Sequence, residues 1–416
     1  MVEKVIVVGG GPGGVSCAMK LLKMGREMGK DIHVSLYEGK RFVGEIHHNQ
    51  CVGILSPPIR EIMEGFGIPF PMELVQREIT GYVLHSRSET ITLDEEGEVS
   101  YAIRRVAFDE YMLSVARKEG VEVIEARVTD VDIHPDRVEV FSESESREAS
   151  VLVGAFGMDD GSAAFMMRAS RYRRPDFLTS IVTKVHPPER FMKDFGNRIH
   201  VFLIPIRGVE FGAITPKGNH LTINIAGKGV TSSHMWAFLR DPRVREVLGP
   251  VDLEHPSNPK DMHFFKSRFP MGTADGFFGN RYVLIGDAAG LVRPFKGKGV
   301  NGACISGSWA AETIMTAGIS YEAFKNHYLP RCSYIISDLP FGRFLRWATI
   351  LSKETGIMDM VIGKARIDRR WREAIYEAIS ANKMYREILL DTIGLDNMIK
   401  FAASIPLRLL LGLIMG

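Results

Sequence analysis

The sequence predicts an α/β protein in which a parallel sheet is combined with a mostly antiparallel sheet and followed by a helical C-terminal region. Three observations lead to this prediction. The chain opens with a β-branched strand, a glycine turn and a helix, a second unit of this kind begins near residue 282, and alternating strands start near residue 177. Unbroken β-branched runs are typical of buried parallel strands, whereas alternation of apolar and polar residues is typical of antiparallel strands.

The first unit carries the pattern G-x-G-x-x-G, whose glycines are Gly9, Gly11 and Gly14. Such glycines permit a tight turn, let a pyrophosphate approach the backbone and let the next helix pack closely. That helix is expected from Gly13 to about Lys23, with Pro12 at its start and its free N–H groups facing the phosphates. Glu38 ends the second strand, where a carboxylate can accept hydrogen bonds from ribose hydroxyl groups. The unit predicts a dinucleotide site, and a glycine-rich turn of another α/β protein is the alternative.

The second unit places glycines and an aspartate at its turns: Gly286, Asp287, Gly297 and Gly299. A buried strand is expected at Tyr282–Ile285 and a helix of small residues from Asn301 to about Ala317. An aspartate such as Asp287, at the carboxyl end of a parallel strand, is well placed for a sugar or ribityl hydroxyl group. The amide groups of Gly299 and Val300 form a second helix N-terminus suited to negative charge. A capped turn without a ligand is the alternative.

The other elements are expected in order along the chain. They are a helix from Ile59, paired strands at 81–93, a strand at 101–105 leading into a helix that starts near Phe108, strands at 121–133, 137–143 and 151–157, four alternating strands between 177 and 227, a helix at 232–248, and helices from Tyr321 onward. We therefore expect one discontinuous domain with both glycine-rich units (1–75, 100–170 and 265–330), an antiparallel-sheet domain (76–99 and 171–264) and a helical region (331–416).

The composition excludes several kinds of partner. A net charge of +2 over 416 residues gives no basis for a nucleic-acid partner. The four cysteines lack C-x-x-C spacing, so we expect no disulfide framework, no metal site and a reducing, cytoplasmic location without a signal peptide. Residues 401–416 are strongly apolar but too short to span a bilayer, so we expect them to cap an internal groove or to contact the inner face of a membrane peripherally.

With both units in place, the chain resembles FAD enzymes of the p-hydroxybenzoate hydroxylase type and, among them, the geranylgeranyl reductase family. The similarity covers about residues 4–330, where GGGPGG, RRVAFDEYML and GDAAGLVRPFKGKGVNGA occur in the family's order. It implies a Rossmann-like FAD-binding domain and an antiparallel sheet that covers the substrate. The residues it assigns to FAD are Gly9, Gly11, Pro12, Gly13, Gly14, Glu38, Gly39, Cys51, Arg105, Val128, Gly286, Asp287, Gly297, Gly299, Val300 and Asn301.

Two segments resemble the reductases more specifically. CVGIL, starting at Cys51, resembles their C-G-x-G-L loop beside the flavin, and FGAITPKG resembles the segment Y-x-W-x-F-P-K-G of the substrate sheet. The resemblance assigns to the substrate Phe211, Ala213, Thr215 and Pro216. Val52 and Ile54 replace the loop's glycines, and Ala213 and Thr215 replace two aromatic rings of the lipid tunnel, so the width of the tunnel and its substrate are open.

Two further departures concern charge. Phe156 stands where the wider superfamily has an aspartate. Lys296 and Lys298 flank Gly297, where neutral or acidic residues are commoner. These lysines are expected either to meet a phosphate headgroup or to form a solvated surface pair.

The resemblance implies an FAD-dependent reductase that hydrogenates C=C bonds of a hydrophobic isoprenoid, either a polyprenyl lipid or an isoprenoid quinone, by hydride transfer from flavin N5. Candidate proton donors are Cys51, His47, His48 and the reduced flavin itself through ordered water. A buried cysteine and loop histidines without a catalytic role are the alternatives. No second G-x-G-x-x-G marks a nicotinamide domain, so ferredoxin, a reduced quinone and NAD(P)H are all open as electron donors.

Two other functions are compatible with the same predicted fold. An FAD-dependent monooxygenase of an aromatic or isoprenoid substrate shares the fold but needs oxygen. A non-catalytic prenyl-binding module on the same fold lacks a working flavin site. A halogenase is disfavoured because the segment W-x-W-x-I-P is absent, and a quinone-reducing dehydrogenase with an iron–sulfur centre is disfavoured because the cysteines are not clustered.

Overall fold

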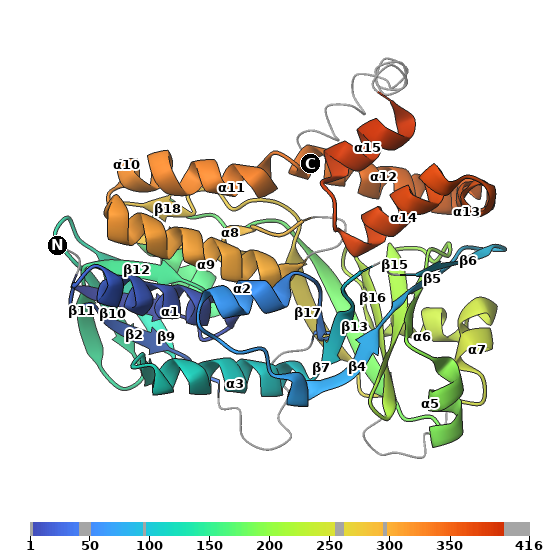
Figure 1. Ribbon diagram of the computed structural model, residues 1–416, viewed down its shortest axis with the longest axis horizontal. Coiled ribbons are helices and arrows are strands. Elements are labelled where there is room, and N and C mark those ends of the chain that lie inside the picture. The colour runs from blue at the N-terminus through green and yellow to red at the C-terminus, as the bar shows by residue number, and fades with distance from the viewer. Residues whose placement is uncertain (1–2, 41–50, 95–96, 254–261, 294–297, 395–416) are drawn as a thin grey trace.

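The computed structural model describes residues 3–40, 51–94, 97–253, 262–293 and 298–394 of the chain. Figure 1 shows two main bodies side by side, a parallel sheet with its helices at the end that holds the N-terminus and an antiparallel sheet at the other end. The last of the C-terminal helices lie above the antiparallel sheet in this view. The α/β fold class expected from the sequence is confirmed.

The parallel sheet has six strands in the order β18-β19-β12-β1-β2-β8. Their bounds are β1 Lys4–Val8, β2 His33–Tyr37, β8 Glu122–Ile124, β12 Val151–Gly154, β18 Phe278–Gly279 and β19 Tyr282–Leu284. All neighbours pair in parallel except β18 and β19, and Val5 lies opposite both Val34 and Val151. The β-branched residues of β1 are buried because the sheet is covered on both faces.

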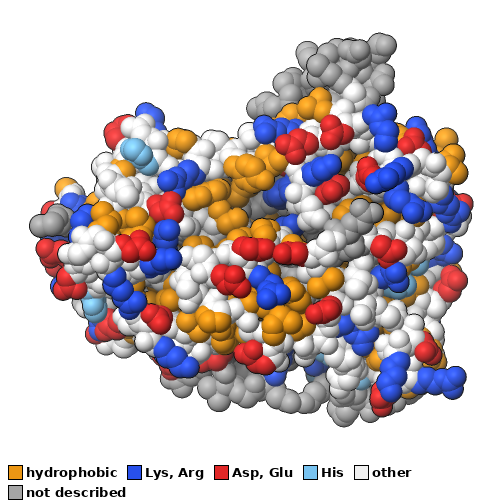
Figure 2. Space-filling model, in the orientation of Figure 1, with side chains coloured by type: hydrophobic (Ala, Val, Ile, Leu, Met, Phe, Trp, Pro, Cys, Tyr) orange, Lys and Arg blue, Asp and Glu red, His pale blue; other side chains and the backbone are white. Residues whose placement is uncertain are grey.

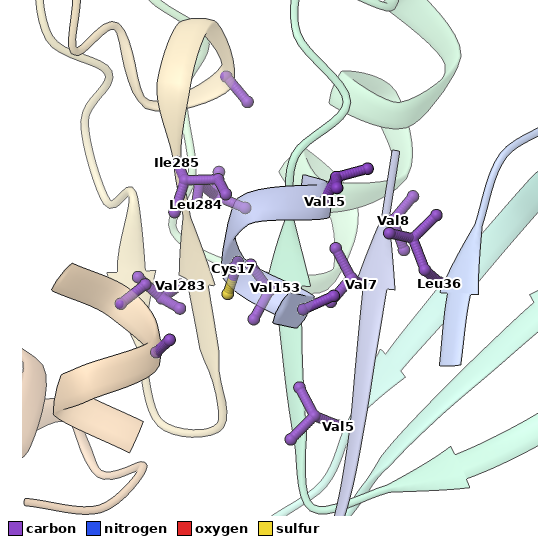
Figure 3. Close-up of a cluster of buried hydrophobic side chains, with 14 of the residues drawn as sticks. Val5, Val7, Val8, Val15, Cys17, Leu36, Val153, Val283, Leu284 and Ile285 are labelled. Carbon is purple, nitrogen blue, oxygen red and sulfur yellow. The ribbon is translucent and has the colours of Figure 1, made fainter. Parts of the chain in front are cut away.

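Helix packing fixes the position of the glycine turns. The helices of this body are α1 Pro12–Glu27, α2 Ile59–Gly65, α3 Arg105–Lys118, α4 Asp160–Ala169, α8 Gly286–Ala289 and α9 Gly299–Thr316. Small residues let α1 and α9 touch, since a Cβ on Gly307 would lie 2.6 Å from the carbonyl oxygen of Gly13. Figure 3 shows Val15 and Cys17 of α1 in the core together with Val7 and Val153 of the sheet.

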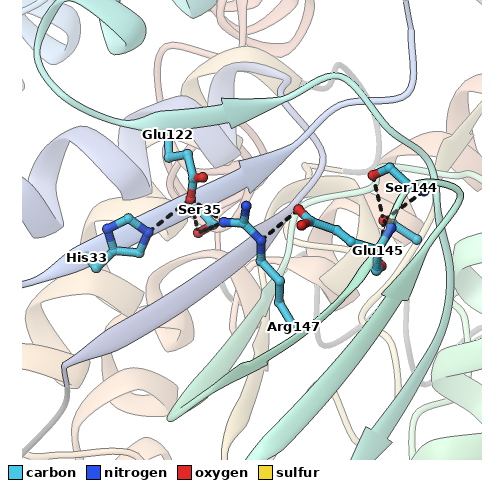
Figure 4. Close-up of polar contacts among 7 residues, drawn as sticks. His33, Ser35, Glu122, Ser144, Glu145 and Arg147 are labelled. Atoms are coloured by element: carbon cyan, nitrogen blue, oxygen red, sulfur yellow. Dashed lines mark hydrogen bonds and ion pairs between the residues drawn. The ribbon is translucent and has the colours of Figure 1, made fainter.

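A polar network joins the parallel sheet to a small antiparallel sheet formed by β9 Val128–Ile133, β10 Val138–Ser142 and β11 Ser146–Ala149. Glu122 accepts hydrogen bonds from Ser35 and from Arg147 of β11, and its carboxylate lies 2.9 Å from the ring of His33 (Figure 4). Burial raises the pKa of Glu122, but these hydrogen bonds outweigh burial and lower it to about 2. The carboxylate therefore holds the two sheets together by charge.

The second body is a seven-stranded sheet in the order β17-β13-β16-β15-β14-β5-β6. Its strands are β5 Gly81–His85, β6 Thr90–Asp94, β13 Phe177–Val185, β14 Arg198–Phe202, β15 Phe211–Lys217, β16 His220–Gly227 and β17 Phe265–Pro270. Only β14 and β5 pair in parallel. The outer helices are α5 Glu189–Phe195, α6 Ser232–Arg240 and α7 Pro242–Leu248 (Figure 1). Phe238 of α6 and Ile214 of β15 belong to the core on this covered face.

A third, three-stranded sheet connects the two bodies. It consists of β3 Ile54–Leu55, β4 Val75–Ile79, after the short 3-10 helix η1 Met72–Leu74, and β7 Ser100–Ile103. The C-terminal region is helical as expected, with α10 Tyr321–Ala323, the π-helical turn η2 Phe324–Tyr328, α11 Leu329–Ile336, α12 Leu339–Thr355, α13 Ile357–Ile367, α14 Arg369–Ser380 and α15 Tyr385–Ile393. Lys353 of α12 donates to the carbonyl oxygen of Val209, and Arg346 pairs with Glu210, so α12 is fixed to the start of β15.

Several element boundaries differ from the sequence-based prediction. The helix predicted at 232–248 is two helices, because Pro242 cannot continue the first and Asp241 caps the second by accepting from the N–H of Arg243. Helix α3 begins at Arg105, one turn before Phe108.

Some predictions concern positions that the structure does not describe: His47, His48, Lys296, Gly297 and residues 401–416. In the parts of the chain that the structure describes, no helix is long and apolar enough to cross a membrane, and no cluster of His, Cys, Asp or Glu side chains could hold a metal ion.

Candidate functional site

A pocket of about 1020 Å³ lies between the parallel sheet and the face of the seven-stranded sheet that is opposite to α5, α6 and α7. Ligand pockets usually measure roughly 300–1,000 Å³, so this one has room for a large cofactor and part of a second ligand. Hydrophobic side chains gather over the middle of the face seen in Figure 2, with charged side chains around them. The lining residues within helices and strands come from β1, β2, β3, β5, β9, β13, β14, β15, β16 and β17 and from α1, α3, α4, α8, α9, α12 and α14.

One end of the pocket is a cradle of backbone without side chains. Gly9 has a φ of +109°, and a Cβ there would lie 2.4 Å from the carbonyl oxygen of Ala155. A Cβ on Gly14 would lie 2.0 Å from the carbonyl oxygen of Gly9, which explains the close contact of α1 with the turn. In the described part of the chain, no side chain caps the N-terminus of α1 at Gly11. Free N–H groups and the helix dipole therefore face the pocket, as a pyrophosphate requires.

The carboxylate of Glu38 is held in the same end of the pocket by backbone amides. Its Oε2 accepts from the N–H of Gly10 at 3.0 Å, and its Oε1 accepts from the N–H of Lys40 at 2.8 Å. Val128 and Arg127 line the wall beyond it. This arrangement suits an adenosine, with the carboxylate toward the ribose and backbone toward the base.

Buried charges surround the middle of the pocket. Arg105, at the start of α3, donates to Asp109 at 2.7 Å. Burial raises the pKa of Asp287 to about 6, and the Arg105 guanidinium opposes that rise. Burial lowers the pKa of Arg105, but Asp109, Cys51 and Asp287 together raise it by more than burial lowers it. The guanidinium therefore stays charged. Asp287 lines the pocket, where its carboxylate can accept hydrogen bonds from ligand hydroxyl groups.

The start of α9 forms the opposite wall of this part of the pocket. Gly299, Val300 and Asn301 line it, and Asn301 is held by donating to the carbonyl oxygen of Ser56 at 3.0 Å. Lys298 donates to the carbonyl oxygen of Pro57 at 2.8 Å and to Asn382 at 2.7 Å. The ammonium of Lys298 thus bridges two segments of the protein. Neither the phosphate headgroup nor the solvated surface pair expected from the sequence includes these contacts.

The cysteine loop lies between the two ends of the pocket. Cys51 is exposed and lines the pocket, and its Sγ accepts from the N–H of Gly53 at 3.3 Å. The carbonyl oxygen of Gly53 accepts from the N–H of Ile103 at 2.8 Å, two residues before Arg105. Ile54 packs against an apolar cluster on the side of the seven-stranded sheet. A thiol on this loop is therefore placed to reach a ligand at the junction.

The other end of the pocket is apolar. This apolar arm is lined by Tyr82, Ile199, Val201, Leu203, Phe211, Ala213, Ile350 and Ile379. Alternate residues of β15 and β14 supply much of it because strand side chains alternate between faces. Glu210 and Arg346 form an ion pair at its wall.

Most residues that the sequence singles out line this pocket: Gly9, Gly11, Pro12, Gly13, Glu38, Gly39, Cys51, Arg105, Val128, Gly286, Asp287, Gly299, Val300, Asn301, Phe211, Ala213 and Thr215. Among the described residues, Gly14 and Pro216 lie outside the lining. Sequence reasoning missed Ile199, Val201 and Leu203, although the alternation of that strand was a usable signal. It also missed Ile350 and Ile379, which no local pattern connects to the pocket.

Comparison with known proteins finds relatives along most of the chain. The chain is 22% identical over 406 residues to the digeranylgeranylglycerophospholipid reductase of Methanocaldococcus jannaschii, covering 93% of this chain and 87% of that one. It is 24% identical over 372 residues to the geranylgeranyl diphosphate reductase of Synechocystis, covering 82% and 84% of the two chains. No family model matches the chain.

Solved structures show the same fold. A geranylgeranyl bacteriochlorophyll reductase-like protein of Thermoplasma acidophilum superimposes with a TM-score of 0.70 at 17% identity, over 97% of this chain and 99% of that one. A flavin-dependent brominase superimposes with a TM-score of 0.68 at 17% identity, over 96% and 98% of the two chains. Such low identities show the fold alone.

The fold, the pocket and these relatives define the class: the chain is an FAD-dependent oxidoreductase. Within that class it is a relative of the geranylgeranyl and digeranylgeranylglycerophospholipid reductases, which confirms the resemblance seen in its motifs.

Proposed function

We propose that this protein reduces C=C bonds in the prenyl chain of a lipid or isoprenoid quinone. The observation that carries the proposal is the shape of the pocket, in which a dinucleotide cradle and an apolar arm meet at the cysteine loop. Two relatives that match most of the chain are named digeranylgeranylglycerophospholipid reductase and geranylgeranyl diphosphate reductase, and these names support the same substrate class.

The residues present fit FAD. The side-chain-free cradle at Gly9 and Gly11 suits the pyrophosphate, Glu38 the adenosine ribose, and Asp287 the ribityl hydroxyl groups. The amides at the start of α9 suit the partial negative charge of an isoalloxazine ring. When bound in its reduced form, FAD supplies hydride for an alkene carbon.

The chain's own residues position the alkene and supply the proton. Tyr82, Phe211 and the aliphatic side chains of the apolar arm hold a prenyl chain away from water. An alkene that takes up a proton develops positive charge, so a dry pocket with aromatic faces favours this step. We assign the proton to the thiol of Cys51, because it lies on the loop between the arm and the cradle. His48, the other donor considered, lies outside the described residues.

A monooxygenase is the second candidate, because a p-nitrophenol 4-monooxygenase of Pseudomonas putida shares the fold with a TM-score of 0.64. The largely aliphatic arm and the reductase names of the relatives in sequence favour the first candidate. A prenyl-binding module without flavin is disfavoured by the complete cradle.

The proposal includes two points about partners. Residues 401–416 contact a membrane peripherally, and deleting them is expected to reduce co-sedimentation with liposomes. The electron donor is a ferredoxin, a reduced quinone or NAD(P)H.

Product analysis distinguishes the two candidate reactions. The FAD-loaded protein is reduced with dithionite and incubated with polyprenyl lipids and quinones under argon and, with NAD(P)H, in air. Mass gains in steps of two hydrogens under argon are expected from a reductase. A product with one added oxygen, formed only in air, would make the protein a monooxygenase.

A further inference from the structure

Lys217 is a buried lysine at the end of the substrate-facing row of β15. Phe211, Ala213 and Thr215 line the pocket, and strand alternation puts Lys217 on the same face. Its side chain is nearly inaccessible, with 5% of the residue exposed. Its Nζ donates to the carbonyl oxygen of Ile103 at 2.8 Å. Strand β15 of the seven-stranded sheet is thereby tied to Ile103, two residues before α3 begins at Arg105.

The same contact supports the cysteine loop. Ile103 also donates its N–H to the carbonyl oxygen of Gly53 at 2.8 Å, and the N–H of Gly53 donates to Cys51 Sγ at 3.3 Å. Gly53 has a φ of +76°, and a Cβ there would lie 2.8 Å from Lys217 Nζ and 2.4 Å from the Ile103 carbonyl oxygen. The turn therefore rests directly on the ammonium group, with no room for a side chain between them.

The charge of Lys217 responds to its neighbours. Burial lowers the pKa of Lys217 to about 8, the interaction with Cys51 raises it, and Lys184 of β13 lowers it. Arg105 also interacts electrostatically with Cys51. Since the pKa lies near 8, the ammonium form prevails at neutral pH and is lost as the pH rises through that value.

We propose that Lys217 is a positioning residue for the proposed alkene reduction, on which this inference rests: its ammonium holds the turn from Cys51 to Gly53 and stabilises the thiolate that Cys51 becomes when it gives up its proton. In that step the Sγ–H bond breaks and a C–H bond forms at one alkene carbon. The other alkene carbon takes the hydride supplied by the two-electron oxidation of reduced flavin. Solvent then returns a proton to the thiolate.

The pH profile of the reaction tests this role, because a merely structural lysine would not move it. We expect the kcat of the wild type for a polyprenyl lipid to fall as the pH rises through about 8. Lys217→Arg keeps its charge at higher pH, so it is expected to retain activity and to move this alkaline limb to higher pH. Lys217→Met is expected to lose about tenfold to hundredfold in kcat at pH 7, with a small change in KM, as for a misplaced reacting group.

Lys353→Met is the matched control, because Lys353 is also buried and donates to a backbone carbonyl, but on α12 and away from the loop. It is expected to keep the alkaline limb. A limb that stays at the wild-type pH in Lys217→Arg, or a Lys217→Met enzyme with the wild-type kcat, overturns the proposal. If Lys217→Met does not fold, the profile of Lys217→Arg decides.

A second readout does not depend on the substrate. Cys51 is the exposed cysteine among four, and the other three are buried, so iodoacetamide applied to the folded holoenzyme reports on Cys51. We expect alkylation at pH 7 to slow several-fold in Lys217→Met, and to stay at the wild-type rate in Lys353→Met. Unchanged alkylation in Lys217→Met contradicts the proposal. Slow alkylation of Lys217→Met, in a protein whose wild type reduces no prenyl substrate, would refute the proposed function and leave only the effect of Lys217 on the cysteine loop standing.

Discussion

Two glycines in helices differ in the space that an added Cβ would find, and this space decides how a substitution by alanine affects stability. A Cβ on Gly14 of α1 would lie 2.0 Å from the carbonyl oxygen of Gly9, whereas a Cβ on Gly363 of α13 meets no described atom within 4 Å. We expect Gly14→Ala to destabilise the protein by roughly 1–3 kcal/mol, as overpacking does, and to weaken FAD binding. Gly363→Ala is expected to stabilise it by roughly 0.5–1 kcal/mol.

Urea denaturation of both variants, with FAD content measured by absorbance, checks this pair of predictions. Equal stability changes in the two variants would show that the turn at Gly9 can move away from a side chain.

Asp287 gives FAD binding a dependence on pH. Burial raises its pKa to about 6, so the carboxylate is charged at pH 7.5 and mostly protonated at pH 5. A charged acceptor binds hydroxyl groups more strongly than a neutral one. We therefore expect FAD to bind roughly tenfold more weakly at pH 5 than at pH 7.5, the effect of one charge-assisted hydrogen bond. Titration followed by FAD fluorescence measures this, and Asp287→Asn should lack the dependence. The same slope in Asp287→Asn would assign it to another group.

For single residues, local patterns predict those that a contiguous stretch of the chain places. Gly9, Gly11 and Glu38 are found from the sequence because the turn, the helix and the strand end that place them are contiguous. Lys217 could not be given a role in this way, because its partner Ile103 lies 114 residues away. The proposed role of Lys217 depends on the contact between the seven-stranded sheet and the three-stranded sheet that contains Ile103.

Strands β5 and β14 carry a histidine pair on the face that α5 to α7 cover. His85 Nε2 and His200 Nδ1 are 2.9 Å apart, and the ring of Phe202 stacks on His85. Burial lowers the pKa of His85 to about 3, with further lowering by His200 and Arg243. Burial also lowers the pKa of His200 to about 4, helped by Arg198. Both rings are therefore neutral in the folded protein at mildly acidic pH.

The unfolded chain takes up protons on these histidines below about pH 6.5, and the folded protein does not until about pH 4. The contribution of the two histidines to the free energy of unfolding is thus fully present above pH 6.5. The free energy of unfolding should fall by roughly 1–3 kcal/mol as the pH drops toward 4.5. Chemical denaturation at several pH values measures this slope. His200→Phe is expected to flatten it and His327→Gln, at an exposed site, to leave it unchanged. A slope that His200→Phe leaves intact would contradict this explanation.

Elements were predicted well where periodicity or composition is strong. The strands of both bodies follow from β-branched runs and from alternation. Pro242 is a sequence signal for the end of a helix, which the prediction of a single helix at 232–248 leaves out. The pocket-lining role of α12 was not predictable, because a helix shows which residues are apolar but not which sheet they meet. We propose that the division into a discontinuous FAD-binding domain, a substrate domain and a helical region, with the bounds expected from the sequence, also describes the protein's domains.

At the scale of the whole molecule, the pocket separates cofactor binding from substrate binding. Ile350 and Leu351 are neighbours on α12, but Ile350 lines the apolar arm and Leu351 is 43% exposed. We expect Ile350→Trp to raise the KM for a long prenyl substrate roughly tenfold or more, since pocket volume sets such preferences, and to leave FAD content unchanged. Leu351→Trp should alter neither. Steady-state kinetics with short and long prenyl chains tests this, and a loss of FAD in Ile350→Trp would show that the two ends are not separate.

In the proposed function, one pocket brings reduced flavin and a prenyl double bond together. A single-turnover experiment tests it most directly: the reduced holoenzyme is mixed with a polyprenyl lipid under argon, and flavin absorbance and lipid mass are followed together. We expect flavin to be reoxidised without oxygen and one double bond to gain two hydrogens for each flavin oxidised. Flavin that stays reduced until air is admitted, with no change in the lipid under argon, would contradict it.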